Sequence, residues 1–129
     1  MCGLGPMAGQ AHHFRQYAPI KIKYAIKRYT DEVNRLYGVM NKQLKKNEFL
    51  AGRYSIADMA CWGWIIPWKN QGQKISDFPH LKRWFEQVGQ RPAVIKGFAA
   101  GKEMRKQLLS ENTKEAKKAK SILFNQRSR

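Results

Sequence analysis

The sequence holds few side chains that could perform chemistry, and their spacing fits none of the common catalytic arrangements. His12 and His13 are adjacent, so on a helix they point about 100° apart and cannot easily ligate one metal ion. His80 has no partner at metal-ligand spacing, and a zinc site needs several such ligands. No Gly-x-Ser-x-Gly elbow is present. The spacing therefore predicts no metal site and no catalytic residue.

The strongest local pattern is a helix start at residues 55–58, which read Ser-Ile-Ala-Asp. In a capping box, Ser55 accepts a hydrogen bond from the N–H of Asp58, and the Asp58 carboxylate accepts one from the N–H of Ser55. Tyr54 and Met59 occupy the positions of a hydrophobic staple. The following residues up to Trp68 are apolar on every face, which predicts a central core helix. Loss of the cap through Asp58→Ala is expected to cost about 1–2 kcal/mol.

Helical periodicity extends through most of the chain. Glycines punctuate residues 3–9, where small residues allow close helix packing, and Pro19 ends any helix there. Apolar residues recur at three- and four-residue steps from about Lys21 to Lys46. Pro79 opens another helix, and Pro92 separates it from a shorter one. No β-alternation of useful length appears. The pattern predicts an all-α fold of about five helices, with a domain at residues 1–101 and a basic helix and flexible tail at 102–129.

Composition and charge limit the function classes. The 129 residues suffice for one core, and an apolar share of 43% argues against wholesale disorder. The longest apolar stretch is too short to span a bilayer, and no secretory signal is evident, so no membrane association is expected. The two cysteines form no C-x-x-C pair, which favours a reducing cytoplasmic setting.

The formal charge of +16 is the most ambiguous signal. Residues 1–101 hold 16 basic and 6 acidic side chains, and residues 102–129 hold 9 and 3. Such a field attracts polyanions nonspecifically, but it also describes a basic solvated surface. No helix-turn-helix, zinc finger or aromatic RNA platform accompanies the charge.

Several strings together resemble a known family. The sequence reads Gly-Leu-Gly-Pro-Met at residues 3–7, Gln-Ala-His-His-Phe at 10–14, Tyr-Ala-Ile-Lys-Arg-Tyr at 24–29, Tyr-Ser-Ile-Ala-Asp at 54–58 and Phe-Pro-His-Leu at 78–81. These strings resemble the C-terminal half of a bacterial glutathione transferase of the Nu class, whose members reduce disulfides with glutathione. The resemblance covers about residues 3–100 and leaves the basic tail unmatched.

The resemblance implies a helical bundle that normally follows a thioredoxin-like domain, which this chain does not contain, and a first helix truncated at its N-terminus. It implies that Arg28 contacts glutathione, and a guanidinium suits a peptide carboxylate because it donates in a bidentate fork. The alternative for Arg28 is a solvated helix residue. The resemblance also places Phe14 and Tyr17 on the co-substrate side. It implies glutathione as a candidate substrate, with no tightly bound cofactor.

Three interpretations of the chain remain open. It is the helical part of an enzyme, inactive alone, that works by homodimerisation or by association with a thioredoxin-like domain. It is instead a non-catalytic module that docks on protein or RNA through its basic surface. Or it is an inert remnant of a broken gene.

Overall fold

Five α-helices account for most of residues 3–102, 114 and 117–118, which the computed structural model describes, and no strand is assigned among them. The all-α fold predicted from sequence is confirmed. The helices are α1 (Leu4–His12), α2 (Lys23–Lys46), α3 (Ile56–Ile65), α4 (Pro79–Gly89) and α5 (Pro92–Ala100). A π-helical turn, η1 (His13–Tyr17), continues α1, and a 3-10 turn, η2 (Ile75–Asp77), precedes α4.

The chain divides into two units, residues 1–90 and residues 91–129. The second unit begins at Arg91, whose extended backbone precedes proline at the first position of α5, and α5 ends before Gly101. The division falls earlier than residue 101, where the sequence analysis sets a domain boundary. Most of the predicted basic helix and tail (residues 103–113, 115–116 and 119–129) lies outside the described residues.

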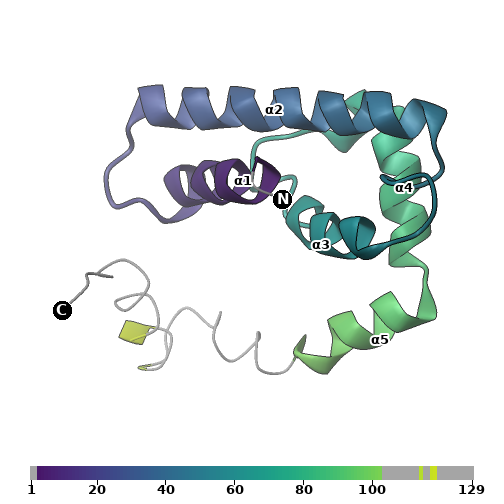
Figure 1. Cartoon of the computed structure of the whole chain (residues 1–129). Helices are drawn as coiled ribbons and strands as arrows, with labels where there is room; N and C mark the ends of the chain where they lie inside the picture. Colours follow the sequence, from purple (N-terminus) through teal and green to yellow (C-terminus); the bar gives the residue numbers. More distant parts are fainter. Residues whose placement is uncertain (1–2, 103–113, 115–116, 119–129) are drawn as a thin grey trace. The chain divides into compact units, whose positions relative to one another are not determined.

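Within the first unit, α1 lies alongside α2, and α4 crosses the far end of α2 (Figure 1). The close approach of α1 to its neighbours depends on small residues. Ala8 and Ala11 are fully buried, and a methyl group added at Gly5 would lie only 3.2 Å from the indole of Trp64 on α3. The glycine-rich start of the chain is therefore a packing surface, as its composition predicts.

The core of this unit is built from the inner faces of α2 and α4. Val33, Tyr37 and Leu44 of α2 are buried at helical spacing. Leu81, Trp84 and Val88 of α4 are buried in the same way. Each such side chain contributes about 1.5–3 kcal/mol through burial.

Helices α2 and α4 also cap each other. The side-chain oxygen of Asn41 on α2 accepts hydrogen bonds from the backbone N–H groups of His80 (2.9 Å) and Leu81 (3.0 Å) at the start of α4. In return, Nη2 of Arg83 on α4 donates to the carbonyls of Leu44 (3.0 Å) and Asn47 (3.1 Å) at the end of α2. The exchange satisfies groups that a helix end leaves without intrahelical partners.

The loop between α3 and η2 is held on α2 by two buried glutamines. Gln71 accepts from the hydroxyl of Tyr37 (2.8 Å) and donates to the carbonyl of Trp64 (2.8 Å). Gln73 accepts from Asn34 (3.0 Å) and donates to the carbonyl of Thr30 (2.9 Å). Because buried amides cost free energy unless they are paired, these bonds fix the path of the loop.

The prediction that α3 is buried on all faces is wrong. Ile65 is fully buried, but Ile56 is 81%, Met59 56% and Trp64 36% exposed. Within the first unit α3 packs against α1 and α4, so part of its apolar circumference is left uncovered. The helix also ends at Ile65 rather than at Trp68, just before Pro67, which cannot continue a helix interior.

Candidate functional site

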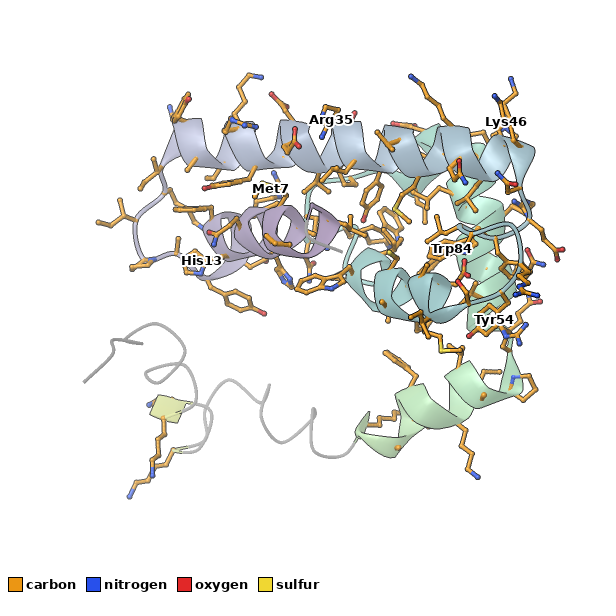
Figure 2. All side chains as sticks on the ribbon, in the orientation of Figure 1. Met7, His13, Arg35, Lys46, Tyr54 and Trp84 are labelled. Carbon is orange, nitrogen blue, oxygen red and sulfur yellow. The ribbon has the colours of Figure 1, made fainter. Side chains whose placement is uncertain are left out.

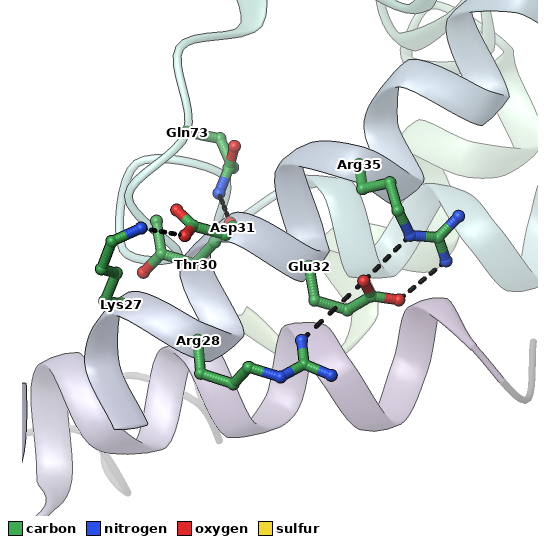
Figure 3. A network of polar contacts seen from close by, with 7 residues as sticks. All are labelled: Lys27, Arg28, Thr30, Asp31, Glu32, Arg35 and Gln73. Atoms are coloured by element: carbon green, nitrogen blue, oxygen red, sulfur yellow. Dashed lines mark hydrogen bonds and ion pairs between the residues drawn. The ribbon is translucent and has the colours of Figure 1, made fainter. Parts of the chain in front are cut away.

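Arg28 lies near the start of α2 in a cluster of three charged side chains (Figure 3). Its Nη1 is 4.0 Å from Oε2 of Glu32, and its side chain is 56% exposed. Arg35 donates to both oxygens of the same carboxylate, from Nε at 2.9 Å and from Nη2 at 2.7 Å. Arg35 therefore holds Glu32 in a bidentate fork, and Glu32 in turn faces Arg28.

The electrostatics of the cluster favour the charged form of Glu32. The hydrogen bonds from Arg35 and the charge of both arginines lower the pKa of Glu32. Within the part of the chain that the structure describes, Arg28 makes no hydrogen bond, and 4.0 Å exceeds an ordinary one. Its guanidinium donors thus remain available to another carboxylate.

Glu32 and Arg35 were not singled out from the sequence, although a signal for them was present. They follow Arg28 by four and seven residues, and side chains three and four apart on a helix are neighbours.

Phe14 and Tyr17, predicted for the co-substrate side, project from η1 with different partners. The ring of Phe14 stacks on that of Tyr29, the residue after Arg28, with centroids 5.5 Å apart and planes 8° apart. The structure therefore joins Phe14 to the first turns of α2. Tyr17 is 39% exposed, and its ring lies 5.2 Å from that of His12. Burial lowers the pKa of His12.

At the start of α3, both bonds of the capping box are formed. The Ser55 hydroxyl accepts from the N–H of Asp58, as predicted, and also from that of Ala57 (3.2 Å). Oδ2 of Asp58 accepts from the N–H of Ser55 (2.9 Å). For the staple, Tyr54 meets Phe49 edge-on at 5.5 Å while Met59 is more than half exposed, so the pairing of Tyr54 with Met59 stays a prediction.

Asp58 has partners that the capping pattern does not reveal. Its Oδ1 accepts from the indole N–H of Trp84 on α4 (2.7 Å) and from the backbone N–H of Leu50 (3.0 Å). The side chain is fully buried. Asp58 therefore joins α3 to α4 and to the loop before α3, and its surroundings match a structural carboxylate rather than a base in contact with substrate.

The remaining reactive groups offer little chemistry. Burial and the nearby Asp58 raise the pKa of the Cys61 thiol, which disfavours the nucleophilic thiolate. In the described residues, no group of three or more His, Cys, Asp and Glu side chains could hold a metal ion. Among the described helices, none combines the length and the apolar character that a membrane crossing requires.

Comparison with known proteins identifies the class to which this helical fold belongs. Residues 6–92 match the family described as glutathione S-transferase, C-terminal domain. The chain belongs to this family. It is 50% identical over 93 residues to the disulfide-bond oxidoreductase YfcG of Escherichia coli, covering 71% of this chain and 43% of that protein. It is 42% identical over 104 residues to the disulfide-bond oxidoreductase YghU of the same organism, covering 74% of this chain and 36% of that one.

Solved structures show the same fold. The glutathione transferase URE2P6 of Phanerochaete chrysosporium, in complex with oxidized glutathione, superposes with a TM-score of 0.72 at 32% identity over 78% of this chain and 48% of that one. A glutathione transferase of Burkholderia graminis, with two glutathione molecules bound per subunit, gives 0.68 at 34% identity over 75% of this chain and 44% of that one. This chain thus spans less than half the length of these relatives, and it corresponds to their C-terminal portion.

Proposed function

We propose that this chain is the all-α part of a glutathione-dependent disulfide-bond oxidoreductase, in which Arg28 contacts glutathione. The names of the two bacterial relatives and the glutathione bound in the structural relatives support this class of reaction. The observation that carries the proposal is the state of Arg28. It is fixed on α2, more than half exposed, and oriented by a carboxylate at 4.0 Å that takes none of its hydrogen bonds.

Glutathione offers carboxylates at both ends, and a guanidinium binds a carboxylate through two parallel hydrogen bonds. Because Arg35 occupies both oxygens of Glu32, Glu32 attracts Arg28 without capturing its donors. The ring of Phe14 stacks on that of Tyr29, the residue that follows Arg28 on α2. Phe14 and the exposed ring of Tyr17 then contact the co-substrate.

We infer that a further domain supplies the thiol chemistry. Reduction of a disulfide by glutathione oxidises two glutathione thiols to one disulfide and releases the substrate as two thiols, and the attacking species is a thiolate. In the described residues no group stabilises such a thiolate, and Cys61 has a raised pKa. The chain by itself is therefore expected to turn over no disulfide above background.

The chain is expected to associate with a thioredoxin-like domain or with a second copy of itself in a homodimer. The uncovered apolar part of α3, which includes Ile56 and Met59, supports association, because contiguous exposed apolar surface marks contact sites. A reducing cytoplasm suits the reaction because glutathione is kept reduced there. Sedimentation of the chain as a clean monomer at tens of micromolar would contradict the homodimer.

The test is reconstitution. The full chain is mixed with the part of YfcG that precedes the region matched by this chain, and reduction of a small disulfide by glutathione is followed. We expect activity only in the mixture, and Arg28→Gln should raise the KM for glutathione by about tenfold or more, as the loss of a charged hydrogen bond does. Arg53→Gln, which removes another exposed arginine, is the matched control and should leave the KM unchanged.

Two results would count against the proposal. One is turnover by the chain alone at a typical enzyme rate of about 1 per second. The other is an equal KM for the Arg28→Gln and Arg53→Gln mixtures, which would return Arg28 to the role of a solvated helix residue.

A further inference from the structure

The basic side chains of α2 after Lys23 fall into two groups that differ in their partners. Across residues 27–35, Lys27 pairs with Asp31, and Arg28 and Arg35 share Glu32 (Figure 3). In the second half, Lys42, Lys45 and Lys46 are exposed and make no ion pair or hydrogen bond with the described residues. The sequence has no acidic residue between Glu32 and Glu48.

These lysines belong to an outward-facing surface, which we call the lysine face (Val39, Lys42, Gln43, Lys45 and Lys46). The buried residues Tyr37 and Leu44 lie on the opposite side of the helix. The five residues line a shallow hollow of about 460 Å³. Figure 2 shows Lys46 at the end of α2, with its side chain directed away from the rest of the first unit.

A structural role does not account for the lysine face. Lysines near a helix C-terminus do interact favourably with the helix dipole. Here, however, Arg83 already donates to the carbonyls of Leu44, Asn47 and Glu48. Glu48, the acidic residue that follows these lysines in the sequence, is engaged elsewhere, because it accepts from Gln87 on α4 at 2.6 Å. Among the residues that the structure describes, none supplies a counter-ion to the three ammonium groups.

The composition of the lysine face indicates which anion it suits. Protein interfaces are depleted in lysine and anchored by aromatic residues, and the lysine face has no aromatic residue. Single-stranded nucleic acids are bound by stacking of their bases on aromatic rings, and the lysine face offers no such ring. A membrane surface calls for a broad apolar face beside the lysines, and here only Val39 is apolar. The phosphates of a duplex require only cations that are free to pair with them at the protein surface.

We propose that the lysine face binds the phosphate backbone of double-stranded nucleic acid without reading its sequence. Each ammonium group neutralises a phosphate and releases condensed counter-ions, so binding weakens steeply with salt. Three such contacts contribute a log–log slope of about −2.7, which is about a 40-fold loss of affinity between about 50 and 200 mM salt. This function is separate from the contact of Arg28 with glutathione and does not depend on it.

The experiment measures binding of a labelled duplex to the full chain by fluorescence anisotropy across that range of salt. The variant is Lys42→Gln/Lys45→Gln/Lys46→Gln. The matched control, Lys27→Gln/Lys74→Gln/Lys82→Gln, removes the same charge from three exposed lysines that are paired with carboxylates. Replacement of the same three face lysines by arginine keeps the charge, and thermal midpoints verify that every variant is folded.

We expect the slope of log affinity against log salt concentration to become less steep by about two to three in the face variant. In the control, the slope should change by less than about one. The arginine variant should bind like the parent. Equal slopes for the face variant and the control would overturn the proposal, because affinity would then depend on the total positive charge and not on the position of the lysines. Failure of the parent to bind duplex would also overturn it. A larger effect of the face variant on single strands, or on vesicles of anionic lipid, would assign the surface to a different ligand.

Discussion

Two carboxylates, Asp58 in the first turn of α3 and Glu32 in the interior of α2, are held in opposite ways. Asp58 is fully buried and accepts from two backbone N–H groups and the indole of Trp84, and it forms no ion pair with any residue that the structure describes. Glu32 lies at the surface between two guanidinium groups, one bidentate and one 4.0 Å away.

The difference shows how burial decides what a charged group does. A buried arginine would need its own desolvation compensated, whereas N–H groups at a helix start are unpaired in any case and lie at the positive end of the dipole. Asp58 is therefore suited to holding elements together. At the surface, water screens an ion pair and leaves it little energetic weight. Glu32 is suited to orienting Arg28 rather than to stabilising the fold.

The largest expected effect follows removal of the buried carboxylate. Asp58→Ala leaves the indole of Trp84 and the N–H groups of Leu50 and Ser55 without their acceptors. Capping alone accounts for about 1–2 kcal/mol. Each buried donor that loses its partner adds about 1–3 kcal/mol. We therefore expect a loss of more than about 3 kcal/mol, measured as the shift in the denaturant midpoint at neutral pH.

A matched substitution sharpens this prediction. Asp77→Ala removes an exposed carboxylate that lies 3.9 Å from Lys74, and the midpoint should change by less than about 0.5 kcal/mol. Asp58→Asn keeps one carbonyl oxygen as acceptor but replaces the other oxygen with a donor, so its midpoint should fall between those of the parent and Asp58→Ala. Equal midpoints for Asp58→Ala and Asp77→Ala would remove the basis for treating the two carboxylates as different.

The sequence predicts the local partner of Asp58, which is Ser55, but not its partner on another helix. The capping box is a local pattern, so Ser55 and Asp58 could be paired from their spacing alone. The bond to Trp84 joins residues 26 apart, and no periodicity encodes it. The mutual capping of α2 and α4 through Asn41 and Arg83 is invisible for the same reason.

The helices themselves were predictable because their signals are also local. The periodicity beginning at about Lys21 corresponds to α2, which begins at Lys23. Pro79 and Pro92 lie at the first positions of α4 and α5, as predicted. The exposure of part of α3 was not predictable, because the apolar composition of a helix does not show which of its faces the neighbouring helices cover. For Arg28, the sequence held the spacing to Glu32 and Arg35 but not the bidentate geometry that leaves its donors available.

The second prediction concerns the surface carboxylate. Glu32→Gln should leave the denaturant midpoint at neutral pH nearly unchanged, because surface ion pairs contribute little. It should nevertheless change the reconstituted enzyme, with a smaller rise in the KM for glutathione than Arg28→Gln causes, because Gln no longer attracts the guanidinium. Any small stabilisation from Glu32 has a defined pH dependence. Its folded pKa is depressed, so the contribution is present above the ordinary value of 4.5 and is lost as the pH falls below it.

Asp31→Asn is the control for that measurement, since it removes the neighbouring carboxylate, which pairs with Lys27. It should leave both the midpoint and the KM unchanged. A destabilisation by Glu32→Gln as large as that by Asp58→Ala would show that the surface cluster holds the fold as much as the buried carboxylate does.

The smallest effect is expected from His12, which is partly buried. It tests how burial affects a group whose charged form is a cation rather than an anion. Its imidazole lies against the ring of Tyr17, and its Nε2 is 3.5 Å from the side-chain nitrogen of Asn70. In the described part of the chain no carboxylate pairs with it to stabilise the protonated form, and burial lowers its pKa below 6.5. Between 6.5 and the lower folded value, the unfolded chain binds more protons than the folded one, so stability is complete above pH 6.5 and falls as the pH is lowered through this window. Denaturant midpoints at about pH 7.5 and 5.5 should therefore differ less in His12→Gln than in the parent.

His80→Gln removes a histidine from α4 and serves as the control. If His12→Gln and the parent lose stability equally on acidification, burial does not keep the imidazole neutral in the folded chain.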